Sequence, residues 1–282
     1  MSGSSGLATV EGGRLYYERD GSGNPIVWLH GGFLDRRVWD PQFARFSSRY
    51  DLVRYDQRGF GRSDPPSTEY AESFDLRDLL DDLAIPSAYL VGLATGARIA
   101  LDFAAVFPNR VDGLVAVAPV LEGYAPSTHE EVALWEDLDR KEEAIAELSQ
   151  SEGAERALAA KIDQWAPNLP PGERTELLAV ALDNRARGLG ESNPLRQKMH
   201  PRTIDRLGAV RCPTLVVTGE RDFAGFAAIA ALLVERLPVA QHSILAGADH
   251  LANRSSPDAF NELLEGYFAR LDFIAMQRGR TW

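Results

Sequence analysis

Residues 88–100 read AYLVGLATGARIA, and this stretch decides the fold. Its apolar first half predicts a short buried strand, while the small residues that follow predict a tight turn and then a helix. Gly92 and Gly96 have the spacing of the G-x-S-x-G nucleophile elbow, a strained strand-to-helix turn that exposes a serine. The central residue here is Ala94, which has no nucleophilic oxygen and no proton to release. It therefore cannot form an acyl-enzyme.

Small residues are common at tight turns, so this motif alone does not identify a nucleophile elbow. Its interpretation depends on other segments, of which two are rich in glycine. Residues 29–33, LHGGF, follow the apolar run 26–29, and glycines there let backbone N–H groups point at a ligand oxygen. Residues 55–64, YDQRGFGRSD, come directly after the next apolar run. We expect them to form a structural loop in which arginine and aspartate side chains tie neighbouring turns together.

Two polar residues complete the pattern. Asp222 lies in the segment GERD after the apolar run 214–218, and His250 lies in GADH after the run 243–245. A lone aspartate in such a turn is usually a local cap, and a lone loop histidine is usually a solvated surface residue. Here both follow successive strands, and open α/β sheets bind ligands at the carboxyl ends of their strands. Their joint position therefore favours a functional pair.

The wider chain alternates short apolar runs with helical patterns. The runs lie at 26–29, 52–55, 114–117 and 214–218, and the clearest helical patterns at 74–83 and 95–107. This alternation predicts an α/β fold with a mostly parallel sheet flanked by helices. Residues 14–18 alternate as in an edge strand, and the Gly/Ser-rich start is expected to be a flexible tail.

One interval breaks the alternation. Residues 121–208 are charged, helical in pattern and punctuated by prolines, with no strand-like run. The sequence therefore predicts an all-helical insertion at 121–208 between two core segments, 1–120 and 209–282. Three residues of this insertion are candidates for the roof of a pocket: Trp135, Trp165 and Met199. Large apolar residues at helical spacing are, however, more often simple core residues.

Together these segments resemble the α/β-hydrolase family over nearly all of the chain. The resemblance rests on HGGF at 30–33, DQRGFGRS at 56–63, the elbow at 92–96, GERD at 219–222 and ADH at 248–250. The family order of nucleophile, acid and histidine is kept as Ala94, Asp222 and His250. The resemblance implies the α/β-hydrolase fold, with a helical cap between the sixth and seventh core strands at the position of the insertion.

The resemblance also implies roles for individual residues. Asp222 would orient His250, and His250 would act as the general base. The oxyanion hole would consist of the backbone N–H of Thr95 and that of Gly32 or Phe33. The Thr95 hydroxyl is not expected to replace the missing nucleophile, because the elbow presents the central side chain and turns the next one away.

Three functions are compatible with this pattern. The first is an ester- or lactone-hydrolase lineage that is hydrolytically impaired through Ala94, whether the alanine is natural or was introduced. The second is a non-covalent enzyme in which His250 and Asp222 abstract a proton, as in a lyase, cyclase or cofactor-independent dioxygenase. The third is a small-molecule binding protein without catalysis, against which the intact Asp222 and His250 argue.

Composition excludes several partners. The 282 residues carry a net charge of −11 without a Lys/Arg cluster, so neither nucleic acid nor an anionic membrane is an expected partner. The single cysteine, Cys212, excludes an internal disulfide framework and a zinc site of several thiolates. We expect no metal and no cofactor, a mostly apolar small molecule as ligand and a cytoplasmic location. Nothing in the sequence determines the oligomeric state.

Overall fold

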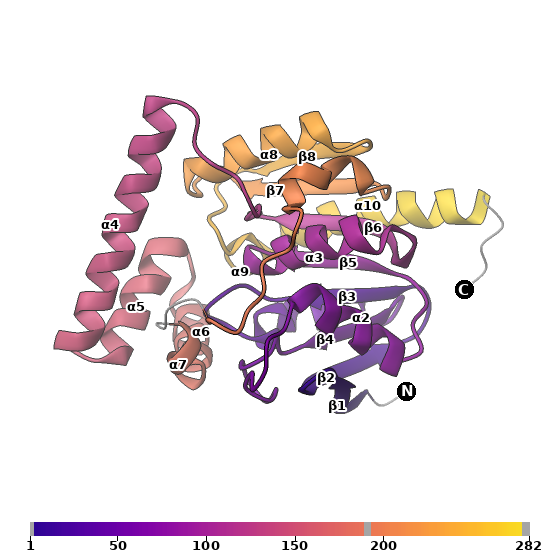
Figure 1. Ribbon diagram of the computed structural model, residues 1–282, viewed down its shortest axis with the longest axis horizontal. Coiled ribbons are helices and arrows are strands. Elements are labelled where there is room, and N and C mark those ends of the chain that lie inside the picture. Colours follow the sequence, from indigo (N-terminus) through magenta and orange to yellow (C-terminus); the bar gives the residue numbers. More distant parts are fainter. Residues whose placement is uncertain (1–2, 189–192, 278–282) are drawn as a thin grey trace.

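The computed structural model describes residues 3–188 and 193–277. Its strands form one eight-stranded sheet in the order β1-β2-β4-β3-β5-β6-β7-β8 (Figure 1). The pairs β1–β2 and β2–β4 are antiparallel, and every other neighbouring pair is parallel. The strands are β1 Ser4–Val10, β2 Gly13–Gly21, β3 Pro25–Leu29, β4 Asp51–Tyr55, β5 Ala88–Leu93, β6 Val111–Val117, β7 Thr214–Gly219 and β8 Ala240–Leu245.

Helices cover the sheet, which explains why its central strand β5 is apolar throughout. Their bounds are α1 Asp40–Phe46, α2 Glu72–Asp82, α3 Thr95–Val106, α8 Ala224–Arg236, α9 Ala252–Ser255 and α10 Pro257–Gln277. Every residue of β5 is buried, as expected for a strand covered on both faces. Phe268 of α10 stacks on Tyr89 of β5 and meets Phe46 of α1 edge-on. The predicted architecture, a mostly parallel sheet flanked by helices, is confirmed.

The N-terminal expectation was wrong. Ser4, Ser5 and Gly6 of the Gly/Ser-rich start are not a flexible tail but begin the edge strand β1, and residues 14–18 belong to the second strand of the sheet rather than to its edge. An antiparallel ladder is made of backbone hydrogen bonds, so small residues without apolar side chains join it when the neighbouring strand is in place. Met1 and Ser2 lie outside the described residues.

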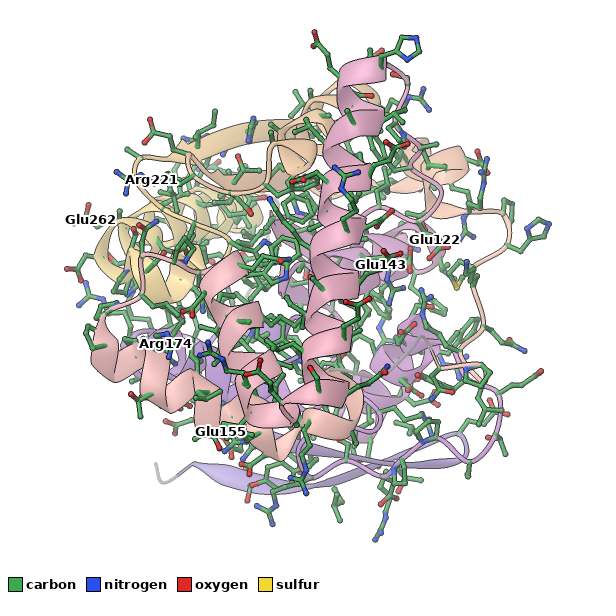
Figure 2. The ribbon with its side chains drawn as sticks, turned by 90° about the vertical axis from the view of Figure 1, so that its left-hand side faces the viewer. Glu122, Glu143, Glu155, Arg174, Arg221 and Glu262 are labelled. Carbon is green, nitrogen blue, oxygen red and sulfur yellow. The ribbon has the colours of Figure 1, made fainter. Side chains whose placement is uncertain are left out.

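Between β6 and β7 the chain leaves the sheet. Helices α4 His129–Ser151, α5 Ala154–Trp165, α6 Pro171–Asp183 and α7 Arg185–Gly188 gather at one end of the sheet, on the left of Figure 1. Figure 2 views the molecule from this side, with α4 and α5 in front of the strands. A capping box of Thr128 and Glu131 starts α4, and its Glu131 N–H···Thr128 Oγ1 bond is 3.1 Å long.

The structure describes residues 121–208 apart from 189–192, and in the described part no strand of this interval joins the sheet. Among the described residues of this interval, the one contact of strand type is an isolated bridge between Tyr70 and Arg196. The proposed boundaries at 120 and 209 stay a prediction, and the C-terminal residues 278–282 also lie outside the described chain. No helix in the described ranges is long and apolar enough to cross a membrane.

The elbow between β5 and α3 requires glycine on both sides of Ala94. A Cβ on Gly92 would lie 2.4 Å from the carbonyl of Gly96, and a Cβ on Gly96 would lie 2.3 Å from the carbonyl oxygen of Leu29. A Cβ atom cannot lie this close to another heavy atom. The turn therefore closes against β3 only because residues 92 and 96 have no side-chain carbon. The spacing read from the sequence is therefore a packing requirement of the elbow.

We predict that Gly96→Ala lowers the free energy of unfolding by about 1–3 kcal/mol, because the added methyl forces β3 and α3 apart. The matched control is Gly266→Ala in α10, where an added Cβ meets nothing within 4 Å. That change should raise stability by about 0.4–1 kcal/mol through reduced freedom of the unfolded chain. Urea denaturation of both variants measures the contrast, and equal stabilities would contradict it.

Candidate active site

Ala94 has a strained backbone. Its φ and ψ are 50° and −108°, a region that non-glycine residues rarely adopt and that costs about 1–3 kcal/mol. Two hydrogen bonds hold it in place: the Ala94 N–H donates to the Val117 carbonyl at 2.8 Å, and the Arg98 N–H donates to the Ala94 carbonyl at 3.1 Å. The elbow geometry therefore persists even though its side chain is a methyl group.

Asp222 follows β7 and His250 follows β8, and the two side chains lie in contact. His250 Nδ1 is 3.2 Å from Asp222 Oδ1 and 3.3 Å from Oδ2. Both side chains are buried, at 8% and 2% exposure. The Phe223 N–H also donates to Asp222 Oδ1 at 2.7 Å, which orients the carboxylate. An ionised Asp222 requires a proton on Nδ1, which leaves Nε2 of a neutral imidazole as the acceptor.

Aromatic rings enclose the imidazole of His250. Phe226 of α8 stacks on it at 5.1 Å between centroids, and Trp165 at the end of α5 lies at 4.6 Å. A backbone hydrogen bond also joins His250 to α5, because the His250 N–H donates to the Trp165 carbonyl at 3.2 Å. The neighbouring Asp249 accepts a hydrogen bond from the Asn168 N–H at 3.1 Å. The α5–α6 connection is therefore attached directly to the loop that carries His250.

A cavity of about 300 Å³ opens beside Ala94 and His250. It is lined by Gly31, Gly32, Phe33, Leu34, Leu93, Ala94, Thr95, Val120, Glu142, Lys161, Trp165, Phe226, His250 and Leu251. Asp222 is not among the lining residues, and it contacts the imidazole at Nδ1. Thr95 is the first residue of α3, so its N–H has no partner within the helix and lies at the positive end of the helix dipole. A Cβ on Gly32 would lie 3.3 Å from Thr95 Oγ1, so the two turns are adjacent.

Sequence reasoning missed two charged residues in this cavity, Glu142 of α4 and Lys161 of α5. Glu142 accepts hydrogen bonds from Lys161 Nζ at 2.9 Å, from Gln164 Nε2 at 2.8 Å and from Trp165 Nε1 at 3.0 Å. The neighbouring Glu143, labelled in Figure 2, is exposed on the same helix. Lys161 and Trp165 are four residues apart on α5 and so share one face, a spacing visible in the sequence once a pocket is assumed.

The three candidate roof residues have different positions. Trp165 lines the cavity. Trp135 lines a neighbouring groove and packs edge-on against Phe223 at 5.0 Å. Met199 accepts a hydrogen bond from the Ser73 hydroxyl at 3.3 Å and is not among the residues that line the cavity. The described residues contain no group of three or more His, Cys, Asp or Glu side chains that could hold a metal ion.

His30 anchors the glycine loop at the cavity. Its Nε2 accepts a hydrogen bond from the Gln57 N–H at 2.9 Å, and its Nδ1 contacts the Gly31 carbonyl at 2.7 Å. This pattern requires the neutral ring with the proton on Nδ1. Full burial lowers the pKa of His30 below its usual value of 6.5, since water no longer solvates the charged form.

Ion pairs connect the loop after β4 to neighbouring elements. Arg58 donates to both carboxylate oxygens of Asp75 in α2, and both side chains are buried. Asp56 accepts from Arg36 Nη1 at 2.9 Å and from the Arg62 N–H at 2.9 Å. The arginine and aspartate side chains of residues 55–64 thus connect β4 to neighbouring turns and do not line the cavity.

Comparison with known proteins identifies relatives over most of the chain. The model described as the alpha/beta hydrolase family matches residues 26–263. A 2-(acetamidomethylene)succinate hydrolase of Mesorhizobium japonicum is 31% identical over 255 residues, which cover 86% of this chain and 87% of that protein. A putative carbamate hydrolase, RutD, of Azorhizobium caulinodans is 28% identical over 271 residues, covering 92% and 96%.

Solved structures give the same picture of the fold. Est816, described as an N-acyl homoserine lactone degrading enzyme, aligns with a TM-score of 0.71 at 26% identity, over 93% of this chain and all of that one. The enol-lactonase of Burkholderia xenovorans aligns with a TM-score of 0.72 at 22% identity, over 94% of this chain and 100% of that chain. At 22% identity, the similarity to the enol-lactonase concerns the fold alone.

We predict that acid pH destabilises the protein through His30. Below about pH 6.5 the unfolded chain binds a proton at His30. The folded chain does not, because the pKa of His30 is lower in the folded state. The free energy of unfolding should therefore fall with pH by up to about 1.4 kcal/mol per unit, from pH 6.5 down to the folded pKa.

Urea denaturation between pH 7 and 5 measures this slope, and His30→Gln, which does not titrate, should reduce it. His242, whose pKa burial also lowers, contributes equally to both proteins. Imidazole ¹⁵N spectra report His30 directly. A folded-state pKa at or above 6.5 would show the prediction to be wrong.

Proposed function

Because the chain belongs to the alpha/beta hydrolase family, we propose that it carries an ester- or lactone-type acyl hydrolase site that binds a small molecule but lacks the nucleophilic oxygen. The observation that carries this proposal is the strained elbow at Ala94, which shares one cavity with His250 and its partner Asp222. Backbone strain of this kind clusters at functional sites. Relatives named as a hydrolase of 2-(acetamidomethylene)succinate and as a degrader of N-acyl homoserine lactones support acyl chemistry.

In this proposal each residue keeps its family role except the central one. The substrate carbonyl oxygen binds the N–H of Thr95 and that of Gly32 or Phe33, which stabilise the developing oxyanion. Asp222 holds His250 in the tautomer that accepts a proton at Nε2. Ala94 occupies the nucleophile position and forms no acyl-enzyme. Loss of the nucleophile from a serine protease triad costs on the order of 10⁶ in kcat, so hydrolysis by this route is strongly impaired.

A second candidate is a non-covalent general-base enzyme. The intact, buried contact between Asp222 and His250 favours it, since a protein that only binds its ligand needs neither residue in that arrangement. His250 Nε2 would take a proton from a water, a hydroxyl or a C–H group of the substrate, and the same N–H donors would stabilise the resulting anion. The space left by the serine hydroxyl would accommodate a water or a substrate oxygen.

We also propose that residues 121–208 act as a cap over the site, with residues 1–120 and 209–282 as the hydrolase core. Support comes from the contributions of α4 and α5 to the cavity, namely Glu142, Lys161 and Trp165. The ion pair of Glu142 and Lys161 gives this otherwise mostly apolar cavity a polar end. The substrate in this proposal is a small, mostly apolar molecule with a reactive carbonyl group.

The decisive experiment adds one oxygen atom. We expect the parent chain to give no covalent adduct and no burst with a fluorophosphonate probe, because residue 94 offers no nucleophile. Ala94→Ser should become labelled and should hydrolyse simple activated acetate esters, as measured by mass spectrometry and by release of the chromophore. A folded Ala94→Ser protein that stays unlabelled would exclude the hydrolase proposal.

Variants of the base separate the two enzyme proposals. In the Ala94→Ser background, Asp222→Asn should lower kcat by about 10⁴-fold through the wrong imidazole tautomer, and His250→Ala should abolish the burst. In the parent background, a turnover that His250→Ala removes would support the general-base enzyme. Ligand binding without any turnover in either background would instead leave a binding protein.

A further inference from the structure

Helix α10 has one buried face and one exposed face. Its buried residues are Phe260, Leu264, Tyr267, Phe268 and Leu271. On the opposite side, exposed residues follow one another at intervals of three or four, so they form one continuous stripe along the helix. We call this stripe the α10 face, and it consists of Ala259, Glu262, Gly266, Ala269, Arg270 and Phe273.

Phe273 gives the α10 face a large apolar side chain. It is 62% exposed, and Met276, on the next turn, is 71% exposed. This end of α10 extends beyond the strands at the right of Figure 1. Phenylalanine and methionine are enriched at protein–protein interfaces, so two such side chains together at an accessible helix end are typical of a contact surface.

Glu262 and Arg270 give the α10 face one charge of each sign. Figure 2 shows Glu262 at the outside of the molecule. Arg270 Nη1 donates to the neutral amide oxygen of Gln241 at 3.3 Å. Within residues 3–188 and 193–277, neither Glu262 nor Arg270 forms an ion pair, whereas Glu265 on the same helix is paired with Arg45 at 2.8 Å. Both charges are therefore available to a partner.

The α10 face is complementary to itself about Gly266. Glu262 and Arg270 lie four residues on either side of it, and Ala259 and Phe273 lie seven residues on either side. Two nearly antiparallel copies of α10 that cross at Gly266 place Glu262 of each copy beside Arg270 of the other. They also place Phe273 of each copy over the small Ala259 of the other. A Cβ on Gly266 would meet nothing within 4 Å, so the helix surface is open at the crossing point.

We propose that the α10 face binds a second copy of this chain, with the two helices antiparallel about a twofold axis at Gly266. A twofold contact uses the same patch on both copies, which is the commonest arrangement in homo-oligomers. The proposal commits to this occupant because opposite charges and unequal side-chain sizes lie at matching distances from Gly266. It is independent of the chemistry at residue 94.

The size of the α10 face predicts a reversible dimer. The helix from Ala259 to Phe273 is about 21 Å long. One pair of helices of this length gives a small contact, whereas stable interfaces bury about 1,200–2,000 Å². A net charge of −11 on each copy also opposes association. We therefore expect a dissociation constant in the micromolar range.

Sedimentation velocity of the full chain measures the association directly. Over concentrations from about 1 µM to about 1 mM, we expect a monomer–dimer equilibrium with no larger species, because a twofold contact closes on itself. A chain that stays monomeric up to about 1 mM would overturn the proposal, and so would growth into open-ended assemblies.

Charge reversal tests the predicted pairing. Glu262→Lys and Arg270→Glu should each weaken dimerisation by at least about tenfold, because each change replaces two attractive contacts by two repulsive ones. An equal mixture of the two variants should dimerise again. In the mixed dimer the introduced lysine faces the introduced glutamate, and the native Glu262 of one variant faces the native Arg270 of the other. A mixture that stays monomeric would refute the antiparallel pairing.

Two exposed residues of α8 provide matched controls. Glu235→Lys and Arg236→Glu change the net charge by the same amounts outside the α10 face, and both should dimerise as the parent does. Phe273→Ser should weaken dimerisation several-fold. Circular dichroism verifies that each variant is folded, as expected for substitutions at exposed positions. Control variants that weaken dimerisation as much as Glu262→Lys and Arg270→Glu would show that net charge governs association, and would overturn the proposal.

Discussion

The close approach of the elbow to β3 is the constraint on which the site depends. Gly96 lies so near the carbonyl oxygen of Leu29 that only a hydrogen fits between them. This contact brings the first turn of α3, with the N–H of Thr95, next to the glycine loop that contains Gly32. Residue 94 of the same turn has a strained conformation, which hydrogen bonds to β6 and within α3 maintain. The geometry therefore belongs to the backbone and does not depend on a serine side chain.

The second organising feature is the attachment of α5 to the loop after β8. The Trp165 carbonyl accepts from the His250 N–H, its ring packs on the imidazole, and its indole N–H donates to Glu142. The insertion and the sheet thus meet at the imidazole itself. A displacement of α4 or α5 would therefore change both the packing around His250 and the shape of the cavity.

Local patterns in the sequence were sufficient for the α/β architecture. Glycine spacing at 92 and 96 and the apolar runs identified the turn and the central strands, because both are set by neighbouring residues. The edge strand Ser4–Val10 was missed, because its partner is a neighbouring strand and its own start carries no apolar signal. The order of Ala94, Asp222 and His250 suggested a common site, and the structure brings them to one end of the sheet, although their roles remain proposals.

The sequence by itself determined the fold class, the glycine requirement of the elbow and the absence of an oxygen at residue 94, since these follow from residue identity and local spacing. Only the tertiary structure decided which side chains of the insertion reach the site. Glu142, Lys161 and Trp165 come from two helices, and they share a cavity with His250 because α4 and α5 pack together at one end of the sheet. Helical periodicity defines the faces of a helix but not the partner that each face meets, so the charged end of the cavity and the groove beside Trp135 arise from packing between elements that are distant in the sequence.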